Sequence, residues 1–171
     1  MPTAMPTSVP APAPATGLVF TAQPGWVVEQ PSSGARRAQY RLPKADGDAE
    51  DATLVVTYFG PNGAGPIEMN IQRWADQFKQ PDGRPSAEVM QHTSRTVNGM
   101  KVEDVDVSGT FLGSGMPGAP PSPPKDGWRM LASVIESDHG PYFAKLAGPQ
   151  ATMAKWEASY RSFVSELKPG K

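Results

Sequence analysis

Alternation of apolar and polar residues predicts a succession of short strands along most of the chain. It is carried by residues 18–20, 26–28, 36–42, 53–59, 87–97, 100–111, 128–136 and 142–147. The segment 53–59, TLVVTYF, is the clearest, because β-branched and aromatic residues favour strands. Asn98-Gly99 supplies the two positive φ angles of a type I′ turn, so the two segments around it are predicted to form a hairpin.

Two other segments show the period of an amphipathic helix. One is residues 66–78 and the other is residues 149–167. In each, the apolar residues recur at three- and four-residue intervals and so occupy one face. We expect these faces to pack on the sheet through Ile71, Trp74, Phe78, Trp156, Tyr160, Phe163 and Leu167.

The order of the elements predicts the fold class. Strands and helices do not alternate strictly, which argues against a doubly wound parallel sheet. We therefore predict an α+β fold, a mostly antiparallel β-sheet of about six or seven strands packed against two amphipathic helices. Residues 18–171 are predicted to form this single domain. Residues 1–17, rich in Pro and Ala and without a charged or aromatic residue, are predicted to be a disordered tail.

The tail has two interpretations for localisation. In the first, Met1 is the natural start of a cytoplasmic protein. In the second, the tail is a spacer that follows a targeting segment missing from this chain. Uncharged Pro/Ala tails often separate a membrane anchor from an exported domain, so we expect an extracytoplasmic protein tethered by an upstream anchor. The apolar runs of the chain itself are too short to span a bilayer.

Composition narrows the classes of function. The 16 basic and 17 acidic residues are balanced and scattered, which argues against a nucleic-acid partner. The chain has no cysteine, which removes thiol catalysis, cysteine-ligated zinc and disulfides. Neither a dinucleotide-binding nor a phosphate-binding glycine motif occurs. We therefore expect no cofactor, no metal and no enzymatic activity.

Two acidic groups provide alternatives to this expectation. Asp104 and Asp106 share the polar face of a strand and could act as acid and base of a hydrolase with His92 or His139. Two aspartates on such a face are more often ordinary polar surface. The loop Asp46–Asp51 carries four carboxylates, but Asp51 stands where a calcium loop needs glycine, so a solvated loop is favoured.

The segment 113–127, GSGMPGAPPSPPKDG, is the candidate partner-binding loop. It is long for a compact domain, and such loops are often functional. Pro120, Pro123 and Lys125 match a proline-rich ligand motif, although a stiff loop is the favoured interpretation. We expect another protein to be bound through Met116, Pro117, Pro120, Pro121, Pro123, Pro124 and Lys125. The alternative is a small-ligand groove lined by Trp26, Tyr58 or Trp128.

Three further stretches carry a family resemblance. The opening Phe20…Pro24-Gly25-Trp26, the middle helix Asn70–Phe78 and the closing FVSELK of residues 163–168 resemble the PsbP-like fold. That fold is shared by an extrinsic photosystem subunit and a Ran-binding nuclear import factor. Ala38–Tyr40, Leu54–Gly60 and Asn70–Gly83 also resemble uncharacterised bacterial exported proteins, often lipoproteins. The resemblance implies a non-catalytic protein-binding accessory module of the bacterial cell envelope.

Overall fold

The computed structural model describes residues 18–30, 36–48, 50–58, 66–112, 124–137 and 140–169. The predicted tail, residues 1–17, lies outside this part of the chain. Strands and helices follow one another in the order β1 (Leu18–Val19), β2 (Val27–Glu29), β3 (Arg36–Leu42), β4 (Ala52–Tyr58), α1 (Ile67–Asp76), β5 (Phe78–Lys79), α2 (Ser86–Val89), β6 (Gln91–Val97), β7 (Met100–Phe111), β8 (Lys125–Ser137), β9 (Gly140–Pro149), α3 (Gln150–Ser165) and β10 (Lys168–Pro169).

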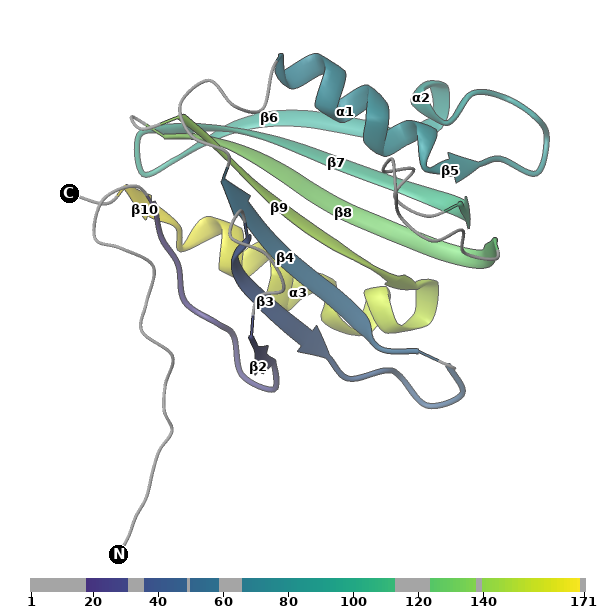
Figure 1. The fold of residues 1–171 in the computed structure, drawn as a ribbon, viewed down its shortest axis with the longest axis horizontal. Helices are drawn as coiled ribbons and strands as arrows, with labels where there is room; N and C mark the ends of the chain where they lie inside the picture. Colours follow the sequence, from purple (N-terminus) through teal and green to yellow (C-terminus); the bar gives the residue numbers. More distant parts are fainter. Residues whose placement is uncertain are drawn as a thin grey trace, which may run out of the picture.

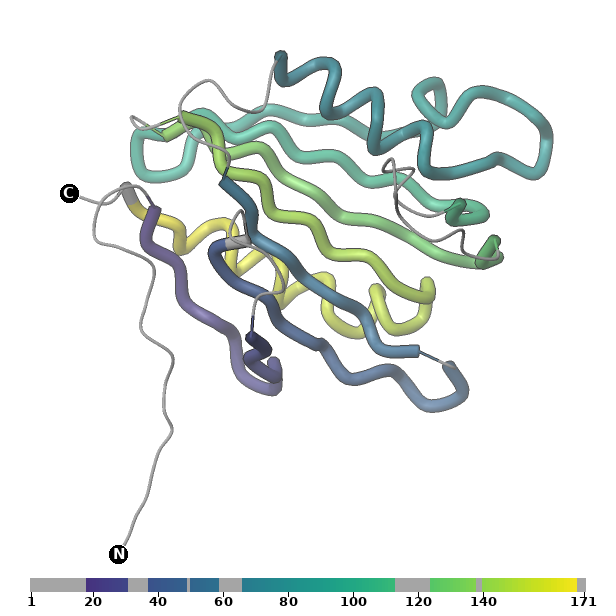
Figure 2. The backbone as a smooth tube through the Cα atoms, viewed as in Figure 1, coloured from purple at the N-terminus to yellow at the C-terminus, as the bar shows by residue number. Residues whose placement is uncertain are grey.

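The strands build one large antiparallel sheet, which confirms the predicted α+β fold class. Its order is β2-β3-β4-β9-β8-β7-β5, and β6 pairs with the other half of the β7 edge (Figure 1). The large sheet has eight strands, against the six or seven predicted. The short strands β1 and β10 pair separately and bring the two ends of the folded chain together (Figure 2).

The sheet has an apolar core on each face, and each core is closed by one long helix. In β8, Leu131 and Ile135 point to the core that Phe163 of α3 completes. Met130 and Val134 alternate with them and point to the core of α1. Strands buried on both faces read as nearly continuous apolar runs, as β8 does between Met130 and Ile135.

The predicted helix faces are confirmed, with one difference at Trp156. The residues buried as expected on the helices are Ile71, Trp74, Tyr160 and Phe163. Phe78 and Leu167 are also buried, but Phe78 belongs to β5 and Leu167 follows the end of α3. Trp156 is only half-buried at the margin of the α3 core, and its indole Nε1 donates to the carbonyl of Pro43 at 2.7 Å. The indole N–H keeps a partner there while most of the ring still packs.

Two elements differ from the sequence expectation. Residues 86–89 form the short helix α2 and not the start of a strand, so β6 begins only at Gln91. The Ser86 hydroxyl donates to the carbonyl of Phe78 at 2.5 Å, a tertiary bond that no local pattern could indicate. The hairpin turn itself is confirmed, with positive φ angles of 47° at Asn98 and 85° at Gly99.

Candidate functional site

The predicted partner-binding loop is described only at its end. Met116, Pro117, Pro120, Pro121 and Pro123 lie outside the described residues. Lys125 is the first residue of β8. Its ammonium lies 2.7 Å from a carboxylate oxygen of Glu50 and 4.6 Å from the ring centroid of Trp128. The foot of the loop is therefore fixed to the sheet by an ion pair and a cation–π contact.

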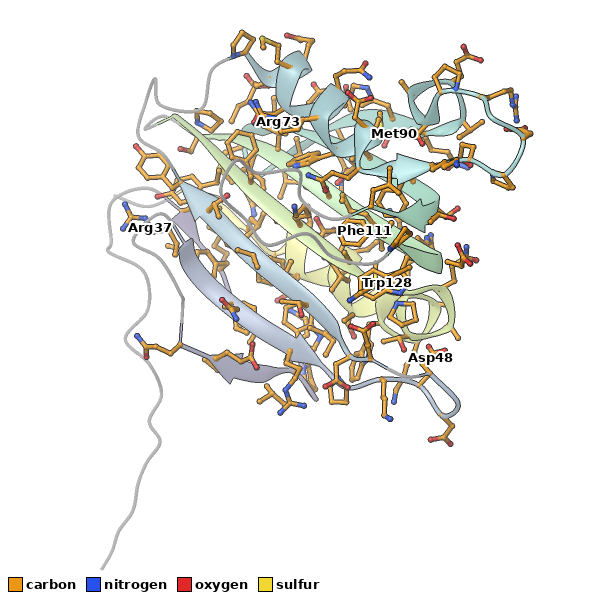
Figure 3. The ribbon with its side chains drawn as sticks, turned by 45° about the vertical axis from the view of Figure 1, so that its right-hand side comes forward. Arg37, Asp48, Arg73, Met90, Phe111 and Trp128 are labelled. Atoms are coloured by element: carbon orange, nitrogen blue, oxygen red, sulfur yellow. The ribbon has the colours of Figure 1, made fainter. Side chains whose placement is uncertain are left out.

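A stacked aromatic pair lies beside this foot. The rings of Phe111 and Trp128 are 5.2 Å apart between centroids and nearly parallel, at 5° (Figure 3). Phe78 packs against Phe111 at 5.3 Å, so the stack continues into the α1 core. Leu112, which follows directly, is 43% exposed. We call Phe111, Leu112, Lys125 and Trp128 the aromatic platform.

A β-bulge positions the platform. The pairing of β7 with β8 shifts register between Gly109 and Phe111, so that Phe111 lies opposite Lys125. Gly109 has φ 146°, and a Cβ there would lie 2.7 Å from the carbonyl oxygen of Lys79. Bulges of this kind often redirect a side chain near a functional site. Here the bulge brings Phe111 over the ring of Trp128.

The platform has the chemistry of a binding surface. Partly exposed aromatic rings beside a cation match the residue types that dominate the energy of protein interfaces. Both rings are half-buried and held by packing, so little freedom remains to be lost on binding. The platform supplies no acid, base or nucleophile other than the ion-paired Lys125.

Asp104 and Asp106, the alternative catalytic pair, do not lie on a wet face as expected. They point to the α3 side of the sheet, the side where Val102 is fully buried. Asp106 accepts two hydrogen bonds from Arg129, at 2.9 and 2.7 Å. Asp104 accepts from Arg95 at 2.7 Å and from Ser133 at 2.6 Å. Because α3 covers part of this face, the carboxylates need cationic partners and receive them.

The same network continues into α3. Arg129 also pairs with Glu157 at 2.9 Å. The hydrogen bonds to Asp106, and to a lesser extent those to Glu157, raise the pKa of Arg129 above its ordinary value. Tyr160 shares a hydrogen bond of 2.8 Å with Ser133, and burial raises the pKa of its phenol. These groups therefore keep their charged or neutral states across the physiological range. The network stabilises the packing of α3 on β7 and β8.

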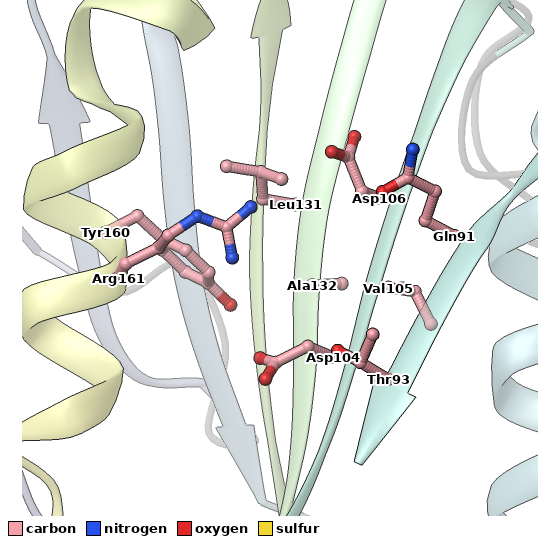
Figure 4. A pocket seen from close by; sticks show the side chains of 9 residues that line it. All are labelled: Gln91, Thr93, Asp104, Val105, Asp106, Leu131, Ala132, Tyr160 and Arg161. Atoms are coloured by element: carbon pink, nitrogen blue, oxygen red, sulfur yellow. The ribbon is translucent and has the colours of Figure 1, made fainter. Parts of the chain in front are cut away.

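A small hollow lies beside this network. Its volume is about 100 Å³, and its polar lining comes from Gln91, Thr93, Asp104, Asp106, Tyr160 and Arg161 (Figure 4). Ligand sites usually enclose about 300–1,000 Å³. This hollow lies below that range and suits a few water molecules.

Trp26, Tyr58 and Trp128 do not line one common groove, because Trp128 lies on the opposite face of the sheet from the other two. Trp26 is 8% exposed and packs on Tyr40 in the α3 core. Tyr58 stacks on Tyr142 with centroids 4.4 Å apart. Trp128 lies on the opposite face, against the α1 core. Trp26 and Trp128 each flank a turn in the sequence, but strand register decides which face each ring occupies.

His92 has a carboxylate partner but no catalytic geometry. Its Nε2 lies 2.7 Å from Glu103, and the Ser94 hydroxyl donates to the same carboxylate oxygen at 2.8 Å. In a serine triad the histidine stands between serine and acid, whereas here the acid stands in the middle. Burial opposes ionisation of Glu103, but the bonds from Ser94, His92 and Lys101 outweigh it and hold its pKa below the ordinary value. His139 lies outside the described residues.

Carboxylates of the acidic loop Asp46–Asp51 bind other groups of the protein. Asp48 accepts from the backbone N–H of Thr152 at 2.9 Å, in the first turn of α3. Asp51 pairs with Arg41 at 3.2 Å, and Glu50 pairs with Lys125. Within the described ranges, no group of three or more His, Asp or Glu side chains is placed to hold a metal ion. None of the described helices is long and apolar enough to cross a membrane.

Comparisons with known proteins identify the fold. No family model matches the sequence, and no curated protein matches it. A protein of unknown function from Pseudomonas aeruginosa is similar in structure, with a TM-score of 0.51 and 11% identity over 85% of this chain and 98% of that chain. Cyanobacterial PsbP from Synechocystis is similar with a TM-score of 0.51 and 10% identity, over 90% of this chain and 86% of that chain. The chain therefore has the PsbP-like fold that its sequence resembles.

Proposed function

We propose that this chain is a non-catalytic accessory module that binds another protein through the aromatic platform and the adjoining segment 113–127. The observation that carries the proposal is the stack of Phe111 on Trp128, half-exposed and bordered by the exposed Leu112 and by Lys125. An aromatic pair anchored in the core and open at one side is a pre-organised anchor for a partner side chain or backbone.

Two observations favour protein binding over the rival functions. The carboxylates that could act in hydrolysis, Asp104 and Asp106, are both bound to arginines. The hollow beside them is well below the size of a small-ligand site. A partner-binding surface needs neither a reactive group nor a deep pocket.

A location in the bacterial cell envelope belongs to the same proposal. It rests on the uncharged Pro/Ala composition of residues 1–17 and on the resemblance to exported proteins. Fractionation of the producing cells with an antibody to the domain tests it. Recovery of the native protein with the membrane or periplasmic fraction supports the proposal, and recovery in the cytosol contradicts it.

The binding surface is tested with two matched variants. Leu112→Asp places a charge on the platform, whereas Met69→Asp places the same charge on α1 at a residue that is 60% exposed. Both positions are exposed, so both variants should fold, which far-ultraviolet circular dichroism checks. A partner captured with the intact chain is purified, and its affinity is measured by calorimetry.

We expect Leu112→Asp to weaken binding at least about tenfold, the effect of losing roughly 1.4 kcal/mol at an interface. Met69→Asp should leave the affinity unchanged. Deletion of residues 116–125 should weaken binding as well. Equal affinity of the intact chain, the Leu112→Asp variant and the deletion would show that the platform is not the interface.

A further inference from the structure

Strand β6 is an open edge of the large sheet. Its seven residues, QHTSRTV, pair with β7 in an unbroken register from Gln91 opposite Asp106 to Val97 opposite Met100. Residues 91–94 and 96 are exposed. The opposite edge is the strand β2, which is only three residues long. Natural sheets usually protect an edge with short strands, proline, a bulge or an outward charge, and β6 has none of the first three.

The backbone of β6 is free on its outer side. The two-residue turn makes Val97 and Met100 a hydrogen-bonded pair, so alternate residues along β6 bond to β7. His92, Ser94 and Thr96 therefore direct their backbone N–H and C=O groups away from the sheet. Among the described residues, none of these groups bonds to another loop or helix.

The side chains of β6 leave this edge clear. His92 and Ser94 both reach back to Glu103 of β7. Arg95, the only residue of β6 that carries a full charge at neutral pH, reaches back to Asp104 at 2.7 Å. The charge of Arg95 is therefore paired within its own sheet and does not stand unpaired at the edge. A row of unpaired backbone groups in this state is a template for another strand.

We propose that β6 pairs antiparallel with β6 of a second copy of this chain, around a two-fold axis at Ser94, so that two sheets become continuous. The sequence of β6 is self-complementary in that register. Ser94 lies opposite Ser94 of the second copy, His92 opposite Thr96, and Thr93 opposite Arg95. Hydroxyl pairs across strands are favourable, and no two like charges lie directly opposite. A two-fold contact of one surface with itself is the commonest way to form a homodimer.

Cysteine cross-linking tests the axis directly, because the chain has no cysteine of its own. In the proposed pairing, the two Ser94 Cα atoms lie about 5.5 Å apart, within reach of a disulfide. Ser94→Cys should therefore form a covalent dimer under mild oxidation. Thr96→Cys is equally exposed, but its two copies would lie roughly 14 Å apart and should cross-link at least about tenfold less. Equal cross-linking of both variants, or none at Ser94, would overturn the proposal.

A second test measures dimer formation without a disulfide. Ser94→Ala and Ser94→Pro both remove the hydroxyl bonded to Glu103, but only proline also removes the outward N–H. In sedimentation velocity, the 18.2 kDa wild-type chain and Ser94→Ala should approach about 36 kDa as concentration rises. Ser94→Pro should remain a monomer. A wild-type chain that stays monomeric up to about 1 mM, or a proline variant that dimerises as well as the alanine variant, would refute the pairing.

Hydrogen exchange of the backbone amides tests the dimer on the wild-type chain, so the result does not depend on whether a variant folds. The amides of His92, Ser94 and Thr96 should gain protection as the protein is concentrated, while those of the exposed loop residues Asp82 and Gly83 should not. Protection that does not depend on concentration would count against the dimer. The aromatic platform is not part of this contact, so failure of the dimer and failure of the proposed function are separate results.

Discussion

Replacing Arg129 by methionine tests whether the ion pairs between α3 and the sheet stabilise the fold. Arg129 forms two hydrogen bonds with Asp106 and one ion pair with Glu157. Methionine preserves most of the aliphatic length and removes the charge. Asp106 then loses the only bonds that its carboxylate forms with the described residues, whereas Glu157 keeps its pair with Arg161 at 2.9 Å.

The expected magnitude follows from burial. Removing one member of a fully buried pair costs about 3–5 kcal/mol, whereas an exposed pair contributes about 0–1 kcal/mol. The side chains of Arg129 and Asp106 are 18% and 22% exposed, so the pair lies between these limits. Two charge-assisted bonds with partial access to water should lower the free energy of unfolding by about 2 kcal/mol when Arg129 is replaced.

Urea denaturation followed by tryptophan fluorescence measures this difference. The matched control is Arg84→Met, because Arg84 and its partner Asp82 are 59% and 53% exposed. That change should cost less than about 0.5 kcal/mol. The double variant Arg129→Met with Asp106→Leu should recover at least half of the loss, since no buried charge is then left unpaired. A loss at Arg129 no larger than at Arg84, or no recovery in the double variant, would refute the reasoning.

Three further predictions concern single positions. Asp48→Ala should lower the unfolding free energy by about 1–2 kcal/mol, because Asp48 caps the first turn of α3, while Asp46→Ala should be neutral in the same urea titration. Gly109→Ala should cost roughly 1–3 kcal/mol, because its φ of 146° and the nearby Lys79 carbonyl exclude a Cβ; an unchanged thermal midpoint would contradict this. The lowered pKa of Glu103 gives stability that is complete above its ordinary value of 4.5 and is lost as pH falls through the folded-state value. Glu103→Gln should therefore show a smaller fall in melting temperature than the wild type between about pH 5 and pH 3, and parallel curves would count against the assignment.

Patterns local in sequence predicted most of the fold. Periodicity of 3.6 placed Tyr160 and Phe163 on the buried face of α3, and both are at most 2% exposed. Asn98-Gly99 predicted the hairpin because few other residue pairs tolerate two positive φ angles. These features depend on residues a few positions apart, which is the range that a single sequence reports well.

Features that depend on distant residues were not predictable. Asp104 was assigned to a wet face, because alternation along β7 does not reveal that α3 supplies cover there. Trp128 was a candidate for an aromatic groove, but its stacking on Phe111 depends on a bulge between strands that are distant in sequence. Strand periodicity gives the face of a residue and not the identity of what packs on that face.

Strand β7 separates the two binding surfaces proposed here. Its first half, from Met100 to Asp106, is covered by β6, and its last residues, Thr110 and Phe111, by β5. The bulge at Gly109 separates these two stretches and turns the strand. A two-fold axis at Ser94, opposite Glu103, would therefore leave both platforms at the far ends of β7, away from the contact. Pairing at β6 would then present two platforms at once, and a partner with two matching segments would bind the dimer more tightly than either platform alone.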